Sequence, residues 1–297
     1  MSNTIDRSSI TVFNAINDLT DILDAAGFEA ARRLSGDVVA ALLEVPRSWL
    51  SLNRDSRIDA QTMGAALSAA MKLARGAPFA YAVGTAAFRH LNLVVDERVL
   101  IPRPETEVLV GEILERFEQR SGSASWGTAI DIGTGSGAIA LSLASEGKFD
   151  RVIATDASND AIEVARINCE RAGAALRAPV EFRHGSLLAP VKGIRASLIV
   201  SNPPYIAFSE ADALPQSVRD WEPPIALMSG GDGLAVTAGI VRQSARHLVS
   251  GGLLALEVDE RRASLVAEMI MGNGEYRDVG VRLDLAGRER FVLGWRI

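Results

Sequence analysis

The sequence is poor in the residues that build disulfides and metal sites. It contains one cysteine, Cys169, and three histidines, His90, His184 and His247. A single thiol excludes an intrachain disulfide framework and a cysteine-rich zinc site. The histidines do not fall at the helical or strand spacing of metal ligands. We therefore expect Cys169 to be a small buried apolar side chain, and we predict no metal site.

The chain also lacks an excess of positive charge. Its 31 lysines and arginines stand against 37 aspartates and glutamates, which gives a formal net charge of −6. Proteins that hold long nucleic acids mainly by neutralising phosphates need the opposite balance. The sequence therefore predicts no stable binding of nucleic acid, although the balance does not exclude a local basic patch.

No segment has the hydrophobicity of a membrane anchor. The chain has no run of about 18 uninterrupted apolar residues, the minimum for a transmembrane helix. The N-terminus is polar from Ser2 to Ser9 and lacks the basic stretch and apolar run of a secretory signal. The composition, 48% hydrophobic and 23% charged, is typical of a globular protein with a sizeable core. We expect a cytoplasmic protein with no membrane partner, and we predict a monomer.

The length of 297 residues favours two domains. Residues 1–85 carry apolar positions at helical spacing, as in Ile16–Leu23, and predict a small all-helical domain of four or five short helices. Two short β-like runs follow, Leu91–Val95 and Val99–Ile101, separated by three polar residues. They predict a β-hairpin linker over residues 86–104.

Residues 105–297 are predicted to form an α/β domain. A helix signal from Glu105 to about Gln119 is broken at Ser121–Ser125, and strand and helix signals alternate after it. Such alternation predicts a doubly wound, Rossmann-like, mainly parallel sheet of seven strands. The predicted strands are Thr128–Ile132, Arg151–Thr155, Val180–Arg183, Ala196–Val200, Leu253–Val258, Val279–Leu283 and Arg290–Trp295, and the helices between them include Ile139–Ser145, Ala161–Ala172 and Val236–Leu248.

A glycine-rich turn follows the first of these strands. Glycines at such a turn let a ligand approach the free N–H groups of the helix that follows. The spacing departs from that of a pyrophosphate cradle, and the leading carboxylate would repel a pyrophosphate but suits an ammonium group. Alone this is a weak signal, because glycine-rich turns also occur as plain connectors. The candidate ligand-binding residues are Asp131, Gly133, Thr134, Gly135, Ser136 and Gly137.

The ends of the next two strands complete the candidate pocket. Asp156 stands where such folds bind two ribose hydroxyls; the alternative is that it caps the helix predicted from Ala161. A nucleoside that lacks phosphate and carries an amino acid fits both Asp131 and Asp156. At the end of the third strand, Ser186 stands where a carboxylate often contacts the adenine amino group. Backbone and apolar contacts, with Leu187 as a candidate, would then hold the base.

The tetrapeptide Asn202-Pro203-Pro204-Tyr205 ends the fourth predicted strand and should face the glycine-rich turn, because ligands of open α/β sheets sit at the carboxyl ends of the strands. An amide nitrogen is a poor nucleophile because resonance delocalises its lone pair. The Asn202 side-chain oxygen and the Pro203 carbonyl can each accept one N–H and aim that lone pair at a methyl donor. Pro203 and Pro204 stiffen the segment, and Tyr205 can pack against a flat amide.

The purely structural alternative for this tetrapeptide is an ordinary turn. Its place at a strand end beside the glycine-rich turn favours the catalytic interpretation. The same chemistry serves the exocyclic amines of adenine and cytosine. The motif therefore fixes the reaction type better than it fixes the substrate.

Taken together, three segments resemble the release-factor glutamine N5-methyltransferases of the HemK/PrmC type. They are Leu100–Glu107, the turn Asp131–Gly137, and Val200–Ile206. The resemblance is strong from about Gly76 to the C-terminus, and the helical N-terminal domain matches in kind. It extends to the segments Ala80–Gly84, Trp221–Leu227 and Gly287–Phe291.

The resemblance implies that the cofactor is S-adenosylmethionine and that the substrate is the glutamine of the Gly-Gly-Gln loop in class I peptide-chain release factors. It also implies that the N-terminal domain recognises the release factor. The cofactor site would add Asn202 to the residues of the turn and strand ends. The substrate site it implies comprises Phe88, Pro102, Arg103, Pro104, Glu105, Thr106, Asn202 and Tyr205.

Some features depart from the family pattern or carry a second interpretation. The segment Phe88-Arg89-His90 lacks the second aromatic residue that the family usually has after the phenylalanine, and Ser186 replaces an acidic residue. For Pro102-Arg103-Pro104 the alternative is a rigid domain junction.

Three other functions remain open at this stage. A DNA adenine or cytosine amino-methyltransferase uses the same tetrapeptide, but it flips its base and usually carries basic recognition loops. The connection from Tyr205 to Trp221 is short and acidic. A glutamine methyltransferase of a ribosomal protein shares the motifs. A domain that only binds cofactor or partner is disfavoured by the intact Asn202 and glycines.

Overall fold

The computed structural model describes residues 10–121, 124–230 and 232–297. The polar N-terminal segment and part of the predicted helix break, Gly122 and Ser123, lie outside the described residues. The chain divides into two compact units. Residues 10–85 and 216–221 belong to the first unit, and the remaining described residues belong to the second.

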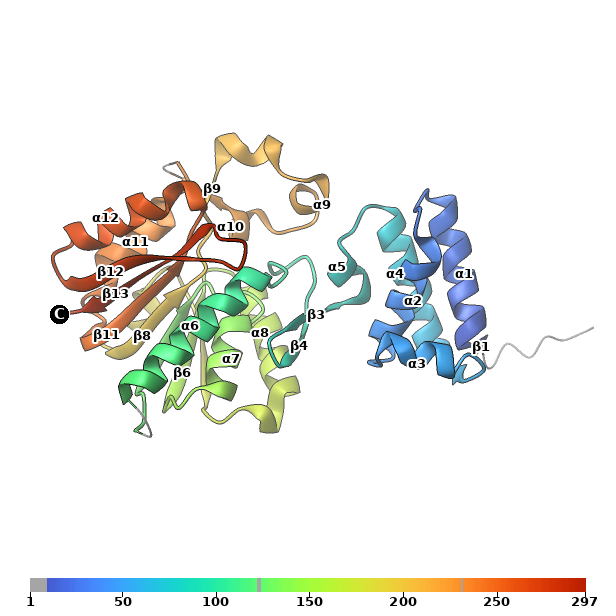
Figure 1. Cartoon of the computed structure of the whole chain (residues 1–297), viewed down its shortest axis with the longest axis horizontal. Helices are drawn as coiled ribbons and strands as arrows, with labels where there is room; N and C mark the ends of the chain where they lie inside the picture. The colour runs from blue at the N-terminus through green and yellow to red at the C-terminus, as the bar shows by residue number, and fades with distance from the viewer. Residues whose placement is uncertain (1–9, 122–123, 231) are drawn as a thin grey trace, which may run out of the picture. The chain divides into compact units, whose positions relative to one another are not determined.

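The first unit is helical, as the apolar spacing predicts (Figure 1). Thr11 and Asp59 cap the two longest helices, because their side-chain oxygens accept the N–H groups of Asn14 and Thr62. A short antiparallel strand pair, which the sequence analysis did not predict, accompanies the helices. The elements are β1 (Ile10–Thr11), α1 (Val12–Ala25), α2 (Ala31–Leu42), α3 (Arg47–Leu52), β2 (Arg57–Ile58), α4 (Ala60–Ala74) and α5 (Phe79–Val83).

The second unit is built on the predicted seven-stranded sheet, with strand order β12-β13-β11-β8-β5-β6-β7. The five strands from β11 to β7 are parallel, while β13 runs antiparallel to both of its neighbours. The chain winds outward from β5 in one direction and then restarts at β8 on the other side. The strands are β5 (Thr128–Ile132), β6 (Arg151–Asp156), β7 (Val180–His184), β8 (Ala196–Ser201), β11 (Leu248–Glu257), β12 (Tyr276–Leu283) and β13 (Glu289–Arg296).

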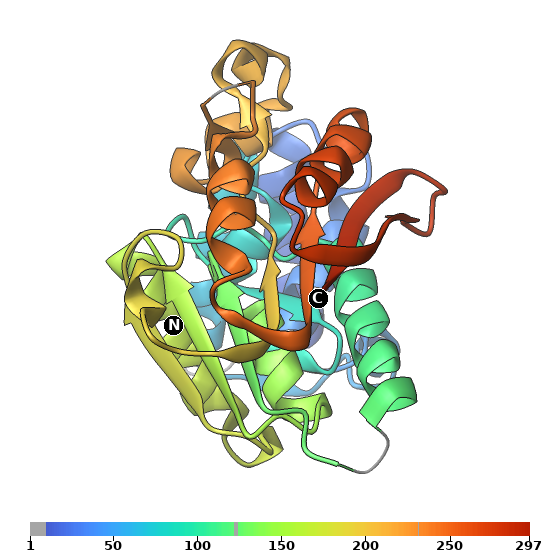
Figure 2. The ribbon, with the colours of Figure 1, turned by 90° about the vertical axis from the view of Figure 1, so that its left-hand side faces the viewer.

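Helices cover both faces of this sheet (Figure 2). One buried cluster joins the sheet to helices α6 and α7 through side chains such as Leu109 and Leu143. A second cluster on the opposite face joins it to α11 and α12 through side chains such as Ile240 and Ile270. Short apolar strands are therefore buried on both sides, as parallel sheets require. The helices are α6 (Pro104–Ser121), α7 (Ala138–Glu146), α8 (Asn159–Ala172), α11 (Ala235–Ser244) and α12 (Ala263–Gly272).

The predicted hairpin exists, but its strand pairing was wrong. Leu91–Val94 (β4) pairs with Thr85–Phe88 (β3) and not with Val99–Ile101. Arg89 and His90 form the turn, and Arg89 takes a positive φ of 51° there. Val99 instead closes a tight turn by donating its N–H to the Asp96 carbonyl. The apolar run therefore begins in a turn and continues as irregular chain, because the local hydrogen bonds of Asp96 compete with strand pairing.

Other boundaries differ by a few residues. The helix predicted over Val236–Leu248 ends at Ser244, and Leu248 already begins strand β11.

The segment between β8 and α11 holds several short elements. They are β9 (Ile206–Ala207), η3 (Phe208–Ala213), α9 (Gln216–Arg219), α10 (Pro224–Leu227) and β10 (Met228–Ser229); the remaining short helices are η1 (Gly173–Ala175), η2 (Ala189–Val191) and η4 (Glu260–Arg262).

Asn168 of α8 connects three elements of the second unit through one buried amide. Its Oδ1 accepts the N–H of Val94 at 2.6 Å, and its Nδ2 donates to the carbonyls of Val94 and Ser136, both at 2.9 Å. The amide thereby continues β4 as if it were a neighbouring strand and also holds the glycine-rich turn. Nothing in the local sequence pattern identified this role.

Replacing Asn168 by alanine should lower the free energy of unfolding by about 2 to 4 kcal/mol, because it leaves buried backbone groups of Val94 and Ser136 without partners. Asn159→Ala is the matched control, since Asn159 is an exposed asparagine of the same helix. Its effect should stay within about 0.5 kcal/mol. Calorimetry of the two variants checks this, and equal losses of stability would contradict the assigned role.

Candidate active site

The second unit contains a cavity at the carboxyl edge of its parallel strands. The segments that follow β5, β6, β7 and β8 all contribute to its wall, at the point where the strand order reverses between β5 and β8. Ligand sites of open α/β sheets lie at this kind of switch point. The lining residues are Arg98, Val99, Leu100, Ile132, Gly133, Gly135, Asp156, Ala157, Ser158, Ala161, Gly185, Ser186, Leu187, Ser201, Asn202, Pro203, Pro204, Ile225, Ala226 and Val236.

The three glycines of the turn have different roles. All adopt positive φ values, of 73° at Gly133, 54° at Gly135 and 86° at Gly137. A Cβ added to Gly133 or Gly135 would meet nothing within 4 Å, and both residues line the cavity. A Cβ on Gly137 would instead come within 3.1 Å of the Leu141 side chain. Gly133 and Gly135 therefore keep the cavity open, whereas Gly137 allows close packing.

Asp131 lies behind the cavity wall and is fully buried. Its Oδ2 accepts the Thr134 hydroxyl at 2.6 Å and the Ala140 N–H at 3.2 Å, so the carboxylate shapes the turn and holds the start of α7. Its Oδ1 is buried and has no partner among the described residues. Burial raises the pKa of Asp131 to about 7. Thr134 and Ser136 are also buried behind the described lining.

Asp156 ends β6 and lines the cavity. Its Oδ2 accepts the Gly135 N–H and its Oδ1 accepts the Ser158 N–H, each at 2.9 Å. Ser158, and not Asp156, caps helix α8 by accepting the Ala161 N–H. Burial raises the pKa of Asp156, while these N–H donors lower it. Because each carboxylate oxygen can accept two hydrogen bonds, Asp156 retains acceptor capacity toward the cavity.

Ser186 and Leu187 line the cavity after β7. Leu187 adopts a positive φ of 52°, which is unusual for a residue with a branched side chain. Space for its side chain comes from Gly239 of α11, where an added Cβ would lie 2.7 Å from Leu187 Cδ1. The absence of a side chain on α11 therefore sets the position of one cavity wall.

Asn202 lines the cavity and is connected to a buried carboxylate through a hydroxyl. Its Nδ2 donates to Thr106 Oγ1 at 3.2 Å, and the Thr106 hydroxyl donates to Glu257 Oε2 at 2.7 Å. Thr106 is 4% exposed and Glu257 1%. Burial raises the pKa of Glu257 to about 7. Glu257 was not predicted as a site residue, although a carboxylate that ends an apolar strand is the same signal that identified Asp156.

The segment around Arg103 is held by a partly buried ion pair. Arg103 Nη2 donates to both carboxylate oxygens of Glu222, at 2.6 and 2.7 Å. Glu222 is almost fully buried, and burial raises its pKa. Glu105 instead pairs with Arg288 at 3.0 Å. The cavity lining does not include Pro102, Arg103, Pro104, Glu105 or Thr106. Buried Thr106 contacts the lining residue Asn202 and so connects this segment to the cavity.

Two other predicted substrate residues are buried. Phe88 has no exposed surface and packs in the core that includes α6 and α7. We therefore correct the predicted assignment of Phe88 from substrate contact to core, because its apolar ring is enclosed by the other side chains of this cluster. Tyr205 follows the cavity-lining residue Pro204 and is partly buried. Burial raises the pKa of Tyr205 to about 12. Its phenol is neutral across the physiological pH range.

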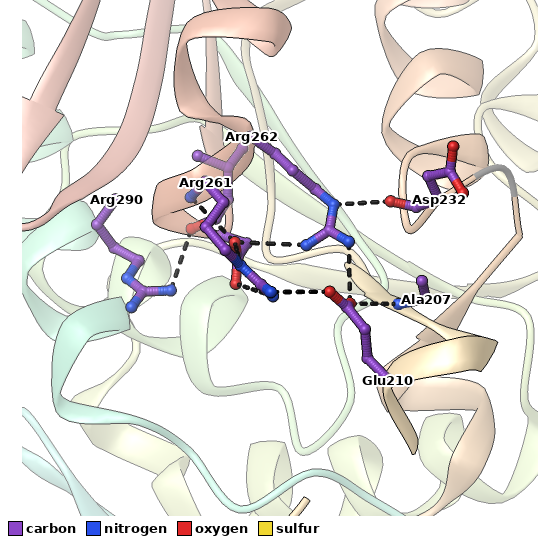
Figure 3. A network of polar contacts seen from close by, with 8 residues as sticks. Ala207, Glu210, Asp232, Arg261, Arg262 and Arg290 are labelled. Carbon is purple, nitrogen blue, oxygen red and sulfur yellow. Dashed lines mark hydrogen bonds and ion pairs between the residues drawn. The ribbon is translucent and has the colours of Figure 1, made fainter. Parts of the chain in front are cut away.

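A polar network holds the chain just after the tetrapeptide (Figure 3). Glu210 accepts the Ala207 N–H at 3.0 Å and forms ion pairs with Arg262 and Arg261, each at 2.9 Å. Arg262 also donates to the Asp232 carbonyl at 2.7 Å. The network joins the β9 and η3 segment to the start of α12. The tetrapeptide is thus fixed by β8 on one side and by these arginines on the other.

Comparisons with known proteins agree with this geometry. A family model described as "Methyltransferase small domain" matches residues 106–217. Two solved structures show the same fold. The methyltransferase from Pyrococcus furiosus has a TM-score of 0.52 and 19% identity, covering 70% of this chain and 90% of its own. The hMettl16 catalytic domain in complex with MAT2A 3'UTR hairpin 6 has a TM-score of 0.54 and 17% identity, covering 82% and 84%.

Similar full-length sequences carry a more specific name. The release factor glutamine methyltransferase of Moorella thermoacetica is 36% identical over 287 residues, which cover 97% of this chain and 99% of the relative. The release factor glutamine methyltransferase of Rhodopirellula baltica is 33% identical, covering 98% of each chain. Both matches span the helical unit and the sheet unit. With the seven-stranded sheet and the strand-end cavity, they establish that the chain belongs to the release factor glutamine methyltransferase family.

Proposed function

We propose that the protein transfers a methyl group from S-adenosylmethionine to the side-chain amide nitrogen of the Gly-Gly-Gln glutamine in class I peptide-chain release factors. The observation that carries the proposal is that Asn202, the glycine-rich turn and Asp156 line one cavity. The names of the relatives supply the substrate class. We expect the enzyme to act as a monomer in the cytoplasm, without stable binding of nucleic acid or membrane. None of the described helices has the length and apolar character that a membrane crossing needs.

Several features of the cavity support the fit of this cofactor. Gly133 and Gly135 leave room for a ligand against the backbone. Asp156 has spare acceptor capacity for ribose hydroxyls, and Ser186 and Leu187 offer polar and apolar contacts for adenine. The unpaired, buried Oδ1 of Asp131 is an acceptor of the kind that an ammonium group requires. When bound, S-adenosylmethionine supplies an electrophilic methyl group on a sulfonium sulfur.

The chemical role of the tetrapeptide is to prepare the amide nitrogen as a nucleophile. Asn202 Oδ1 and the Pro203 carbonyl each accept one substrate N–H, which favours a tetrahedral nitrogen with its lone pair directed away from both acceptors. Pro203 and Pro204 carry no N–H that would compete for these acceptors, and Tyr205 packs beside the amide plane. The proton leaves to solvent after the nitrogen has become cationic, so no strong base is needed.

The segment before α6 is proposed to shape the substrate side of the site. In the partly buried Arg103–Glu222 pair, one guanidinium nitrogen contacts both carboxylate oxygens, and this charge-assisted contact restricts Pro102 and Pro104. Glu105 and Thr106 belong to the same segment, and Thr106 reaches Asn202 directly.

Alternative acceptors share the chemistry of the tetrapeptide. A ribosomal protein would present the same glutamine amide, and an adenine or cytosine would present an exocyclic amine. Mass spectrometry of the Gly-Gly-Gln peptide from cells with and without this protein decides among them. An unmethylated glutamine in both strains would remove release factors from the proposal.

We further propose that the helical unit holds the protein substrate. The unit has a hydrophobic core of its own, which includes Val12, Leu19, Leu23 and Val38, so it can present a surface independently of the sheet.

Asp156→Ala should raise the dissociation constant of S-adenosylmethionine by at least about 10- to 150-fold, because it removes one or two charge-assisted hydrogen bonds that are each worth about 1.5 to 3 kcal/mol. Asp160→Ala is the matched control, since Asp160 is exposed in the first turn of the following helix. Its affinity should match that of the wild type. Isothermal calorimetry measures both variants, and unchanged affinity in Asp156→Ala would remove this residue from the cofactor site.

Asn202→Ala should lower the single-turnover rate of methylation about 10²- to 10³-fold, the usual loss for one preorganised polar contact at a reacting centre. Cofactor affinity should change much less, because the glycine-rich turn and Asp156 are untouched. The measurement uses a Gly-Gly-Gln-containing protein beside calorimetry with the cofactor. A rate within about threefold of wild type, below the tenfold that about 1.4 kcal/mol represents, would mean that Asn202 is structural.

Deleting the residues before Gly76 should leave cofactor affinity largely intact, while methylation of an intact release factor falls about tenfold or more, the effect of losing about 1.4 kcal/mol of substrate contacts. Circular dichroism and thermal unfolding must first show that the shortened protein is folded. Equal turnover by the shortened and complete proteins would refute a role of the helical unit in holding the substrate.

A further inference from the structure

The proposed role of Asn202 depends on which way its side-chain amide faces. The oxygen accepts hydrogen bonds and the nitrogen donates them, but a rotation of 180° exchanges the two with almost no change in shape. Only an amide with Oδ1 toward the substrate can accept the substrate N–H. In the reverse orientation the Asn202 Nδ2 would face the substrate N–H, and two hydrogen-bond donors would oppose each other. The active site therefore needs a device that fixes the polarity of this amide.

The contacts of Thr106 provide such a device. Thr106 Oγ1 lies 2.7 Å from Glu257 Oε2 and 3.2 Å from Asn202 Nδ2. A hydroxyl carries one hydrogen, and an ionised carboxylate can only accept. Thr106 therefore donates its hydrogen to Glu257 and can only accept from Asn202. The Asn202 nitrogen must then face Thr106, which leaves Oδ1 free for the substrate.

The fold brings these residues together from three distant parts of the second unit. Asn202 follows β8, Thr106 lies in the first turn of α6, and Glu257 ends β11. Leu256 pairs with Ser201 in the parallel ladder, so Glu257 is level with Asn202 on the neighbouring strand. The near-complete burial of Thr106 and Glu257 leaves little opportunity for water to replace either hydrogen bond.

We propose that Glu257 is a positioning residue which, through the Thr106 hydroxyl, holds the Asn202 amide with its oxygen toward the substrate nitrogen. This inference rests on the proposed function of Asn202 as the acceptor of the substrate N–H. A protonated Glu257 could donate to Thr106 and release the Thr106 hydrogen toward Asn202. The amide would then be held with the wrong polarity.

The groups around Glu257 determine its pKa, and this pKa sets the pH at which the Asn202 amide loses its fixed orientation. Burial and the neighbouring Glu105 favour the neutral carboxyl, while Thr106, Arg290 and Arg103 favour the ionised form. Tyr205 also faces this carboxylate and stays neutral. The result is a pKa of about 7. Methylation should therefore decline as the pH falls through about 7, because protonation removes the acceptor that orients Thr106.

The first test is kinetic. Thr106→Val keeps the shape but removes the hydroxyl, and it should lower kcat about ten- to hundredfold, the cost of slight misplacement at a reacting centre. KM and cofactor affinity should change little. Thr106→Ser restores the hydroxyl and should recover most of the lost activity. Thermal unfolding of both variants shows whether either change has altered the fold.

A double-mutant cycle separates this role from a general structural one. If Thr106 acts through Asn202, adding Thr106→Val to Asn202→Ala should cost less than about twofold more, because interacting sites are not additive. A loss of activity in the double mutant equal to the product of the two single-mutant losses would overturn the proposal. Equal activity of Thr106→Val and wild type, or equal loss in the valine and serine variants, would also overturn it.

A second readout does not depend on turnover. The side-chain amide resonances of Asn202, assigned by their absence in Asn202→Ala, should shift with a midpoint near pH 7 in the wild type and lose that transition in Glu257→Gln. The amide of Asn168, which is hydrogen-bonded to backbone groups of Val94 and Ser136, is the internal control. Asp131 also has a pKa of about 7, so only the comparison with Glu257→Gln assigns the transition.

The two hypotheses can fail separately. Absence of Gly-Gly-Gln methylation by the wild type would contradict the proposed function. The titration of the Asn202 amide would still test the contacts from Glu257 through Thr106 to Asn202. An Asn202 titration that persists in Glu257→Gln would contradict the positioning role, even if the wild type methylates the release factor.

Discussion

The register of three neighbouring parallel strands is the constraint on which the site depends. Ile132 of β5 and Leu256 of β11 both pair with Ser201 of β8, so the three strands end at the same level. Each strand then delivers one functional group at a common edge. A shift of one residue in β8 would turn Asn202 to the other face of the sheet. The hydrophobic faces that bury β8 on both sides therefore also fix the position of Asn202.

The carboxylates at this edge show how one residue type acquires different roles from its surroundings. Asp131 receives a hydroxyl and a backbone N–H and supports the turn, whereas Asp156 receives two backbone N–H groups and still reaches the cavity. Glu257 receives only the Thr106 hydroxyl among the described hydrogen bonds. Burial raises the pKa of all three. The three carboxylates therefore differ in their hydrogen-bond partners, and among them Asp156 is the one that lines the cavity.

The sequence allowed most of the sheet and the main strand ends to be predicted, because an apolar run that stops at a polar residue is a local signal. Asp156 and Asn202 were predicted as site residues in this way, and both line the cavity. The contact between Thr106 and Glu257 joins residues 151 positions apart and leaves no local pattern. The hairpin pairing failed because the apolar run Val99–Ile101 resembles a strand, while the turn formed by Asp96 prevents it from pairing. Phe88 was misplaced because aromatic residues fill cores as readily as they contact ligands.

The contact between Gly239 and Leu187 has a consequence for how this enzyme can diverge. Leu187 forms part of the cavity wall, but its space is provided by a helix residue whose missing side chain never meets a ligand. A larger residue at position 239 would push Leu187 inward, and a smaller residue at position 187 would leave a void behind the wall. Substitutions at the two positions should therefore be accepted as pairs. Changes in the shape of this cavity along a lineage should be accompanied by changes on α11, on the opposite side of the cavity wall.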